Sequence, residues 1–519
     1  MGAEKTNDPT VLATTSIPSP SSPSSPPPKP YSIYNRNEKW ILVTLVATAG
    51  LFSPLPANIY FPAIPVLTTV FNRSIEDMNL TVTIYLIFQG IGPMLWGPLA
   101  DKWGRRPLYL VCLSILTASC IGLALCPPSA YWLLLLLRAF QAGGCASTIA
   151  LGAGVIGDIA AAEERGGYFG MFNLGPMLAP CIGPALGGAL SDHLGWRSIF
   201  WFLVICSGCC LFLVFLVFPE TLRGVVGDGS ISPGKGPLAR PVFKVVGRRV
   251  GVVEKREDVC PERGLEENGG LEVSPSQSPS PTRGSSNPFR LLLYPDIALT
   301  LTYTGIIHAV NYTITTTISA SFAEIYPNLS GTAIGLCYLA GGGGMILGST
   351  ITGKLLNRDY VTIKKRYTES HPEDGTEDGV PIEYARLRMT PVLLLLLVGC
   401  VLSWGWLLER KVHLAVPMVL QVILGYSSIS ILNATMTLMI DIVRTQSSGV
   451  IACTNLVRCS LAAILVSFID RATRKLGFGW TYVILGLICA LLLPLIFIEI
   501  KQGPKWRAKR VQGLGKEEG

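Results

Sequence analysis

Long apolar blocks alternate with short polar segments along the chain, from about residue 40 to residue 500. Several blocks exceed the roughly 18 residues that a helix needs to cross a lipid bilayer. Because lipid offers an exposed backbone no hydrogen-bond partners, blocks of this length must be helical. The pattern predicts twelve membrane-spanning helices, at 40–64, 80–99, 107–126, 131–154, 167–190, 197–218, 296–319, 330–353, 390–408, 413–438, 448–469 and 478–500.

The twelve predicted spans form two sets of six, separated by a long polar gap with several glycines and a Ser/Pro stretch. That composition is typical of a flexible linker. We therefore expect an all-α polytopic membrane protein built from two pseudo-symmetric six-helix bundles. Its expected parts are a disordered cytoplasmic tail at 1–38, an N-terminal bundle at 39–222, a disordered cytoplasmic linker at 223–289, a C-terminal bundle at 290–500 and a basic cytoplasmic tail at 501–519.

The composition supports this fold class. Of the 519 residues, 49% are hydrophobic and only 15% are charged, whereas a soluble protein carries about a quarter charged residues. The net charge of +8 could indicate a nucleic-acid partner, but the cations cluster beside apolar blocks, as topology-setting charges do. We therefore expect no nucleic-acid partner. All cysteines except Cys260 lie in or at the ends of apolar blocks, so we expect them to act as small hydrophobic residues rather than metal ligands.

Lysine and arginine in the loops predict the orientation, because membrane insertion favours them on the cytoplasmic side. With both termini cytoplasmic, the basic groups at 102–106, 354–366 and 501–510 lie inside, whereas those at 410–411 and 471–475 are local exceptions. The plasma membrane is the expected location, with a vacuolar or vesicular membrane as the alternative.

This orientation places three Asn-x-Ser/Thr glycosylation sites outside, at Asn72, Asn79 and Asn328. Glycans are added to such sites on the outer side of secretory membranes. Matching sites at Asn311 and Asn433 fall inside predicted spans and should stay unmodified.

The most distinctive polar stretch is Gly97-Pro-Leu-Ala-Asp-Lys-Trp-Gly-Arg-Arg-Pro107, called the charged segment below. It lies between the second and third predicted spans, and its glycines allow two helices to approach closely. One carboxylate with cations in reach suits a contact that forms and breaks during a conformational change. The residues assigned to this gate are Gly97, Asp101, Gly104, Arg105 and Arg106.

The charged segment resembles the loop between the second and third helices of major facilitator transporters, Gly-x-Leu-x-Asp-x-x-Gly-Arg-Arg/Lys. The loop after the fourth span is also similar to that family, and the resemblance implies that Asp158 and Arg165 join the gate. Solvated loop charges, which contribute little, are the alternative. A second copy at 353–360 has Asn357 in place of Asp101, so we expect the charged gate in the first half alone.

The fifth span carries a sequence rich in glycine and proline. It resembles the antiporter signature of drug:proton exporters, Gly-x8-Gly-x3-Gly-Pro-x2-Gly-Gly, except that Ala179 stands at the second glycine position. Close packing of helices is the alternative interpretation. The matching residues are Gly170, Gly183, Pro184, Gly187 and Gly188.

The fourth span contains an arginine, Arg138, roughly 10 Å from one end of the helix. An unpaired charge in a membrane is costly, so Arg138 should face the interior of the bundle. With Gln141, and with the glycine displaced by one position to Gly143, it resembles the family motif Arg-x-x-Gln-Gly, which implies a role in proton coupling. The alternative is an arginine that only braces helices by bonding to carbonyl groups.

The sequence shows no Asp or Glu in the middle of a predicted span, so the group that carries a proton stays unassigned. The one deep titratable side chain is His308; histidine can switch its charge near neutral pH, but a lone buried histidine is more often a hydrogen-bonded core residue. Sparse polar groups among aromatic rings suit amphipathic ligands, although each could instead hold helices together. The candidates for the substrate cavity are Asn58, Gln89, Asn173, His308, Asn311, Tyr312, Tyr338, Gln421, Tyr426 and Asn433.

Taken together, the motifs resemble the twelve-span drug:proton antiporters, in particular their fungal quinidine- and multidrug-resistance branch. The resemblance implies a monomeric, cofactor-free exporter of amphipathic organic small molecules, driven by proton antiport with alternating access. A dedicated exporter of a secondary metabolite, organic acid or polyamine is the second hypothesis, and a non-transporting membrane receptor or scaffold is the third. The sequence has no metal triad, Gly-x-Ser-x-Gly elbow or Walker loop, so we expect neither an enzyme nor a self-contained ATP pump.

Overall fold

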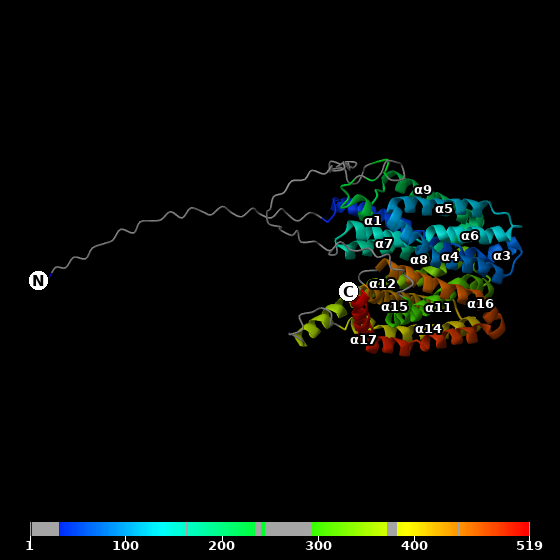
Figure 1. Ribbon diagram of the computed structural model, residues 1–519. Helices are drawn as coiled ribbons and strands as arrows, with labels where there is room; N and C mark the ends of the chain where they lie inside the picture. Colours follow the sequence, from blue (N-terminus) through cyan, green and yellow to red (C-terminus); the bar gives the residue numbers. More distant parts are fainter. Residues whose placement is uncertain are drawn as a thin grey trace.

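The computed structural model describes residue 2 and residues 31–161, 164–231, 233, 240–243, 292–370, 381–443 and 447–517, with side chains up to residue 510. The regular secondary structure of these residues is helical (Figure 1). The predicted tail before residue 31 and most of the predicted linker lie outside the described residues. The elements in chain order are α1 (Arg36–Leu51), α2 (Leu55–Asn58), η1 (Phe61–Ala63), α3 (Ile64–Phe71), α4 (Ile75–Trp103), α5 (Arg105–Leu125), α6 (Tyr131–Cys145), α7 (Thr148–Ile159), α8 (Arg165–Leu194), α9 (Arg197–Val217), α10 (Arg223–Val226), α11 (Pro295–Ile325), α12 (Gly331–Ser370), α13 (Ile382–Leu387), α14 (Thr390–Glu409), α15 (Ala415–Ile442), α16 (Ser447–Ala490) and α17 (Leu493–Glu517).

Several helices start or break where local chemistry requires it. The Ser74 hydroxyl accepts the Asp77 N–H at 3.1 Å, and the Asp77 carboxylate accepts the Ser74 N–H at 3.3 Å. This capping box starts α4 five residues before the predicted boundary. The first predicted span is broken by prolines into α1, α2, η1 and α3, and the fourth is split into α6 and α7. Inside α16, Gly477 adopts φ 77°, which turns the chain between the eleventh and twelfth predicted spans.

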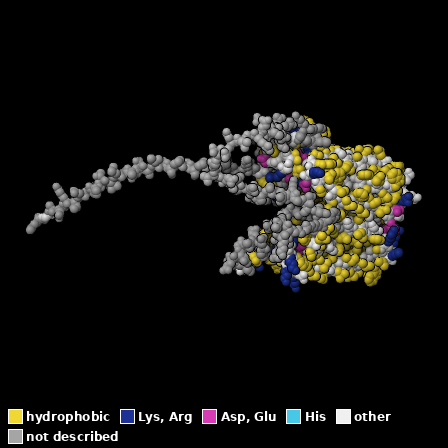
Figure 2. Space-filling model, in the orientation of Figure 1, with side chains coloured by type: hydrophobic (Ala, Val, Ile, Leu, Met, Phe, Trp, Pro, Cys, Tyr) yellow, Lys and Arg dark blue, Asp and Glu magenta, His cyan; other side chains and the backbone are white. Residues whose placement is uncertain are grey.

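Apolar side chains cover the middle of the molecule, and charged side chains gather at its two ends (Figure 2). Among the described residues, ten segments are long and apolar enough to cross a membrane. One of them, 449–510, contains two of the predicted spans, and threonine-rich α11 is not among them. The predicted all-α membrane fold is confirmed.

The helices from α1 to α9 pack mainly on one another, as do those from α11 to α17. We call these groups the first and second halves; they lie side by side and meet where α4 packs on α16 and α8 packs on α12 (Figure 1). The terminal end of the molecule is where α1 begins and α17 ends, and the distal end is the opposite one, where α3 meets α4.

Polar contacts join the two halves toward the distal end. Glu76 and Arg471 form an ion pair at 3.0 Å. The Asp192 carboxylate accepts the backbone N–H of Thr332 at 2.5 Å and its hydroxyl at 2.7 Å. The helices also touch there without intervening side chains, because a Cβ added to Gly188 would lie 2.3 Å from a carbonyl oxygen of α12. These contacts join the two halves at the distal end.

Candidate functional site

The charged segment at the terminal end is helical, not a loop as expected. Gly97 and Asp101 lie in the last turns of α4, Arg105 begins α5, and only Gly104 separates the two helices. Gly104 has φ 110°, a conformation that residues with a Cβ rarely adopt. A Cβ at Gly104 would also lie 2.3 Å from a carboxylate oxygen of Glu220. Both the backbone turn and the packing therefore require glycine here.

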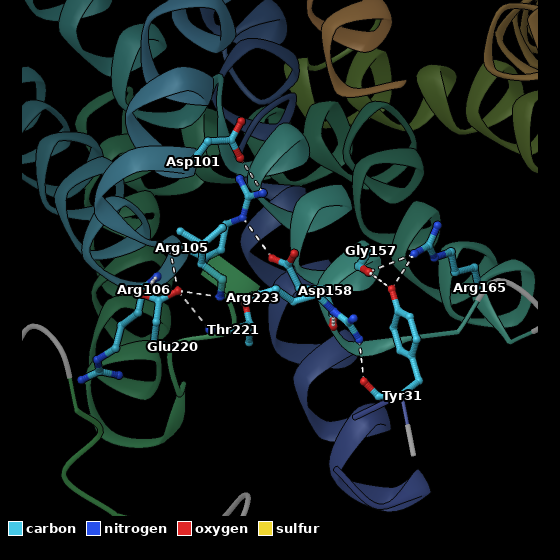
Figure 3. A network of polar contacts seen from close by, with 11 residues as sticks. Tyr31, Asp101, Arg105, Arg106, Gly157, Asp158, Arg165, Glu220, Thr221 and Arg223 are labelled. Carbon is cyan, nitrogen blue, oxygen red and sulfur yellow. Dashed lines mark hydrogen bonds and ion pairs between the residues drawn. The ribbon is translucent and has the colours of Figure 1, made fainter. Parts of the chain in front are cut away.

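Arg105 connects two carboxylates in this network (Figure 3). Its guanidinium lies 2.8 Å from the Asp101 carboxylate and 3.2 Å from that of Asp158. The side chain of Asp158 is 11% exposed, whereas that of Asp101 is 46% exposed. Water therefore screens the Asp101 pair much more than the Asp158 pair.

The centre of the network is a carboxylate that the sequence analysis did not single out, Glu220, which follows α9 (Figure 3). It accepts the backbone N–H groups of Arg105 at 2.8 Å and Arg106 at 3.1 Å, at the first turn of α5. It also accepts those of Thr221 and Leu222, each at 2.9 Å. A carboxylate at a helix N-terminus satisfies free N–H groups and complements the helix dipole. The sequence signal was a charge directly after the sixth apolar block, in Pro219-Glu-Thr221, a further stretch that resembles the major facilitator family but was assigned no gating role.

Arg106 is buried and points away from Asp101, contrary to expectation. Its guanidinium donates to the backbone carbonyls of Val214, Phe218 and Phe215, the last at 2.8 Å. It therefore ties the start of α5 to the end of α9. Consecutive helical residues face different directions, so the two neighbouring arginines have different partners.

Arg165 lies at the edge of the network and contacts neither Asp101 nor Asp158 by a recorded bond. It donates to the Gly157 carbonyl at 3.1 Å and to the Tyr31 hydroxyl at 2.9 Å. Arg223 lies on the same aromatic ring, 3.5 Å from its centre, and donates to the Asp158 carbonyl at 2.9 Å. Tyr31 and Arg223 come from segments that were expected to be a disordered tail and linker.

Tyr34 adds a neutral donor beside this network. Its hydroxyl donates to the backbone carbonyl of Glu220 at 3.5 Å. Burial, and secondly the Glu220 carboxylate, raise the pKa of the Tyr34 phenol above its ordinary value. The phenol therefore stays protonated and keeps donating at physiological pH.

The glycines of the antiporter-like sequence lie where α8 meets other helices. A Cβ at Gly187 would lie 2.0 Å from the Ile59 carbonyl oxygen, and one at Gly183 would lie 3.1 Å from Asn58 Cβ. Gly188 faces α12, and the Pro184 carbonyl lies 2.4 Å from where a Cβ at Gly335 would stand. Gly170, by contrast, has nothing within 4 Å. The sequence therefore serves close packing within the first half and across the two halves.

Arg138 is completely buried on α6, between the rings of Tyr60 and Tyr85, at 4.3 and 4.4 Å from their centres. Its Nη1 donates to the Gln141 side chain at 2.7 Å and to the Pro56 carbonyl at 3.1 Å. Its Nε and Nη2 have no hydrogen-bond partner among the described residues. Cation–π contact compensates the buried charge in part, and two donors stay available.

A small pocket lies against α8, α11, α12 and α15. Three of the candidate cavity residues line it: Asn311, Tyr338 and Gln421. The Tyr338 hydroxyl and the Gln421 amide nitrogen have no hydrogen-bond partner among the described residues. Tyr312 lies near it, because Phe61 packs against both Tyr312 and Tyr338.

The other cavity candidates lie elsewhere. His308 contacts the Tyr312 ring, with ring centres 5.8 Å apart. Gln89 donates to the Ser53 carbonyl, and Asn433 donates to Ser349, so both join helices. The remaining three are Asn58, which donates to its own helix, Asn173, which is exposed, and Tyr426, which is half-buried beside Gly348.

The second half has charged contacts of its own at the terminal end, and the expectation of a charged gate in the first half alone stays a prediction. Arg386 pairs with Asp441 at 2.8 Å. Three further carboxylates, on Asp296, Glu383 and Glu499, are at most 1% exposed. The sequence analysis missed them because they lie at the ends of apolar blocks or outside them.

One of the predicted glycosylation sites is wrong. Asn72 and Asn328 are exposed, but Asn79 is buried inside α4. The capping box at Ser74 begins the helix early and turns Asn79 into the core, where an attached glycan would not fit.

Comparison with known proteins shows the family of the chain. The family model of the Major Facilitator Superfamily matches residues 46–467. The chain is 33% identical over 492 residues to Citrate exporter 1 of Aspergillus niger, which covers 93% of this chain and 90% of that protein. It is 33% identical over 466 residues to MFS antiporter QDR1 of Candida albicans, covering 89% and 87% of the two chains. It is 31% identical over 484 residues to Probable transporter AQR1 of Saccharomyces cerevisiae, covering 93% and 80%.

Proposed function

The chain belongs to the Major Facilitator Superfamily, and from that premise we propose that it exports amphipathic organic small molecules by proton antiport with alternating access. It is a multi-pass membrane protein and a transporter. The observation that carries the proposal is the pocket against α8, α11, α12 and α15, where a helix of the first half meets helices of the second. Its mostly apolar lining, with the ring of Tyr338 and few polar groups, suits amphipathic ligands.

The contacts at the two ends support alternating access. The two halves are joined at the distal end by the Glu76–Arg471 pair and by the bonds of Asp192 to Thr332. At the terminal end, Arg105 joins α4, α5 and α7 within the first half. A transporter of this kind must exchange one closed end for the other, and we assign the Arg105 network to the state described here.

An organic anion is a second candidate for the cargo, favoured by buried donor groups, of which Tyr338 and Gln421 line the pocket and the arginines lie outside its lining. Arg138 and Arg458 each have a guanidinium nitrogen without a hydrogen-bond partner among the described residues, and Tyr312, Tyr338 and Gln421 add further donors. A cluster of unpaired donors with cations attracts carboxylates. The similarity to a protein named as a citrate exporter points the same way.

The experiment that tests these proposals uses purified protein in proteoliposomes with an imposed pH gradient. Labelled quinidine and labelled citrate serve as the two probe cargoes. Antiport requires that a gradient of protons drives accumulation of cargo and that collapsing the gradient abolishes it. Cargo movement indifferent to the gradient would refute antiport, and the preferred probe separates the two cargo classes.

We further propose that both termini are cytoplasmic, that the protein acts as a monomer and that it lies in the plasma membrane. The exposed positions of Asn72 and Asn328 at the distal end support the orientation. In a glycosylating host, Asn72→Gln and Asn328→Gln should each remove one glycan, seen as increased gel mobility. Asn79→Gln should change nothing, because Asn79 is buried. A chain that carries no glycan at either exposed site would argue for the opposite orientation.

A further inference from the structure

Three buried carboxylates meet at the terminal end of the second half, and we call them the carboxylate cluster. They are Asp296 in the first turn of α11, Glu383 in the first turn of α13, and Glu499 on α17. Their exposed fractions are 1%, 0% and 0%. Three elements that are distant in sequence therefore bring negative charges together out of contact with water.

Two arginines on α17 each form an ion pair with one of these carboxylates. Arg510 lies 2.9 Å from the Asp296 carboxylate, and Arg507 lies 3.5 Å from that of Glu383. Arg510 also donates to the Ile442 carbonyl at 3.3 Å, so its position is fixed by α15 as well. Two cations thus compensate two of the three negative charges.

Glu499 forms no ion pair within the described part of the chain. Neither of its carboxylate oxygens has a hydrogen-bond partner among the described residues. Burial and the charges of Asp296 and Glu383 disfavour its charged form, whereas the nearby Thr300 hydroxyl and Arg510 favour it. The Tyr303 phenol on α11 is a further titratable group that faces it. A buried, uncompensated carboxylate is strongly destabilising, and a bound proton removes that cost.

A metal ion does not fit the cluster as well as a proton. In the described part of the chain, no group of three or more His, Cys, Asp or Glu side chains is placed to hold a metal. A proton needs only one oxygen. The carboxylate cluster therefore favours a proton over a metal ion.

We propose that Glu499 is a proton-binding site of this transporter: in the conformation described here it holds a proton that entered from the solution at the distal end, and it releases that proton to the solution at the terminal end when α17 separates from α11 and α13. This inference rests on the proposed antiport function where it concerns coupling, but proton binding itself does not depend on it. In the conformation described here the cluster carries one proton. Acidification therefore stabilises this arrangement, and alkalinisation weakens it as the third carboxylate becomes charged.

The direct test is infrared spectroscopy of the full-length protein in lipid nanodiscs during a pH titration. The carbonyl-stretch band of a protonated carboxylic acid should persist at least about two pH units above the ordinary glutamate pKa of ~4.3. Glu499→Gln should remove this band. The matched control is Asp441→Asn, because Asp441 lies at the same end but is paired with Arg386 at 2.8 Å, and it should leave the band in place. A wild type without the band, or a Gln variant that retains it, would overturn the assignment.

Transport measurements then ask whether this proton is coupled. In proteoliposomes, Glu499→Gln should lower gradient-driven accumulation of quinidine or citrate at least ten-fold relative to exchange of the same probe without a gradient. Equal ratios in variant and wild type would refute a coupling role for Glu499. A wild type that ignores the gradient would instead refute the proposed antiport, while the infrared result still decides whether Glu499 binds a proton.

Discussion

At the residue scale, exposure separates the two carboxylates that contact Arg105. Asp101 is nearly half exposed, so its pair with Arg105 should contribute less than about 1 kcal/mol to stability. We therefore predict that Asp101→Asn is expressed and folds normally but loses most transport, because the lost contact matters for switching rather than for folding. The readouts are the thermal midpoint in detergent and quinidine export. Lys102→Gln, which changes an exposed neighbour, is the control, and full transport by Asp101→Asn would refute the gating role.

Glu220 should behave in the opposite way, because its carboxylate accepts four backbone N–H groups. Removing these acceptors leaves buried donors unsatisfied at the start of α5. Glu220→Ala should therefore lower stability by at least about 2 kcal/mol, seen as a reduced thermal midpoint and reduced expression. Glu220→Gln retains one acceptor oxygen and should lose less. If Ala and Gln variants are equally stable, the N–H bonds are not the reason that Glu220 is needed.

Part of the candidate site was predictable from residues and part was not. Asp101, Arg105 and Asp158 were assigned to one gate, and the structure brings them together. Glu220 was missed because its contact with Arg105 spans 115 residues and depends on how α9 packs on α5. Arg106 was misplaced because a motif does not say which face of a helix each residue occupies.

At the element scale, the glycines of α8 provide a test inside a single motif. A Cβ at Gly187 would lie 2.0 Å from the Ile59 carbonyl oxygen, whereas one at Gly170 would meet nothing within 4 Å. Gly187→Ala should therefore destabilise the protein by about 1–3 kcal/mol, the usual cost of overpacking. Gly170→Ala should leave the thermal midpoint unchanged or slightly raised. Equal losses from both substitutions would mean that the motif acts through something other than packing.

The apolar blocks predicted where helices lie, but not where they end. The Ser74 capping box extends α4 backwards, which buries Asn79 and removes a predicted glycosylation site. At the other end of the chain, α17 continues through the predicted basic tail to Glu517, because Arg507 and Arg510 have buried partners there. Hydropathy does not register such polar contacts, so the carboxylate cluster was not predicted.

At the scale of the whole molecule, the two halves matter as units that separate and rejoin. Small residues on α8 and α12 let the two halves pack closely. Because lipid supplies no hydrophobic driving force between helices, this close contact is the main force that holds the halves together. Polar bonds at the distal end add to that contact. The Thr332 N–H and hydroxyl both bond to Asp192, which lies on the other half. Changes at the distal end should therefore alter which end is open without unfolding either half.

The ion pair between Glu76 and Arg471 offers the clearest test of this separation. Glu76→Lys places two cations where the two halves meet, and their repulsion should favour opening of the distal end. Arg471→Glu places two carboxylates there and should favour opening for the same reason. Because this pair is exposed, each change should raise distal accessibility only about two- to five-fold. The probe is native Cys181, which is buried where α8 meets Gly342 of α12, labelled by a membrane-impermeant maleimide and located by peptide mass mapping. The double variant restores opposite charges and should return labelling toward the wild-type rate, whereas faster labelling in the double variant than in either single one would show that the pair does not close the distal end.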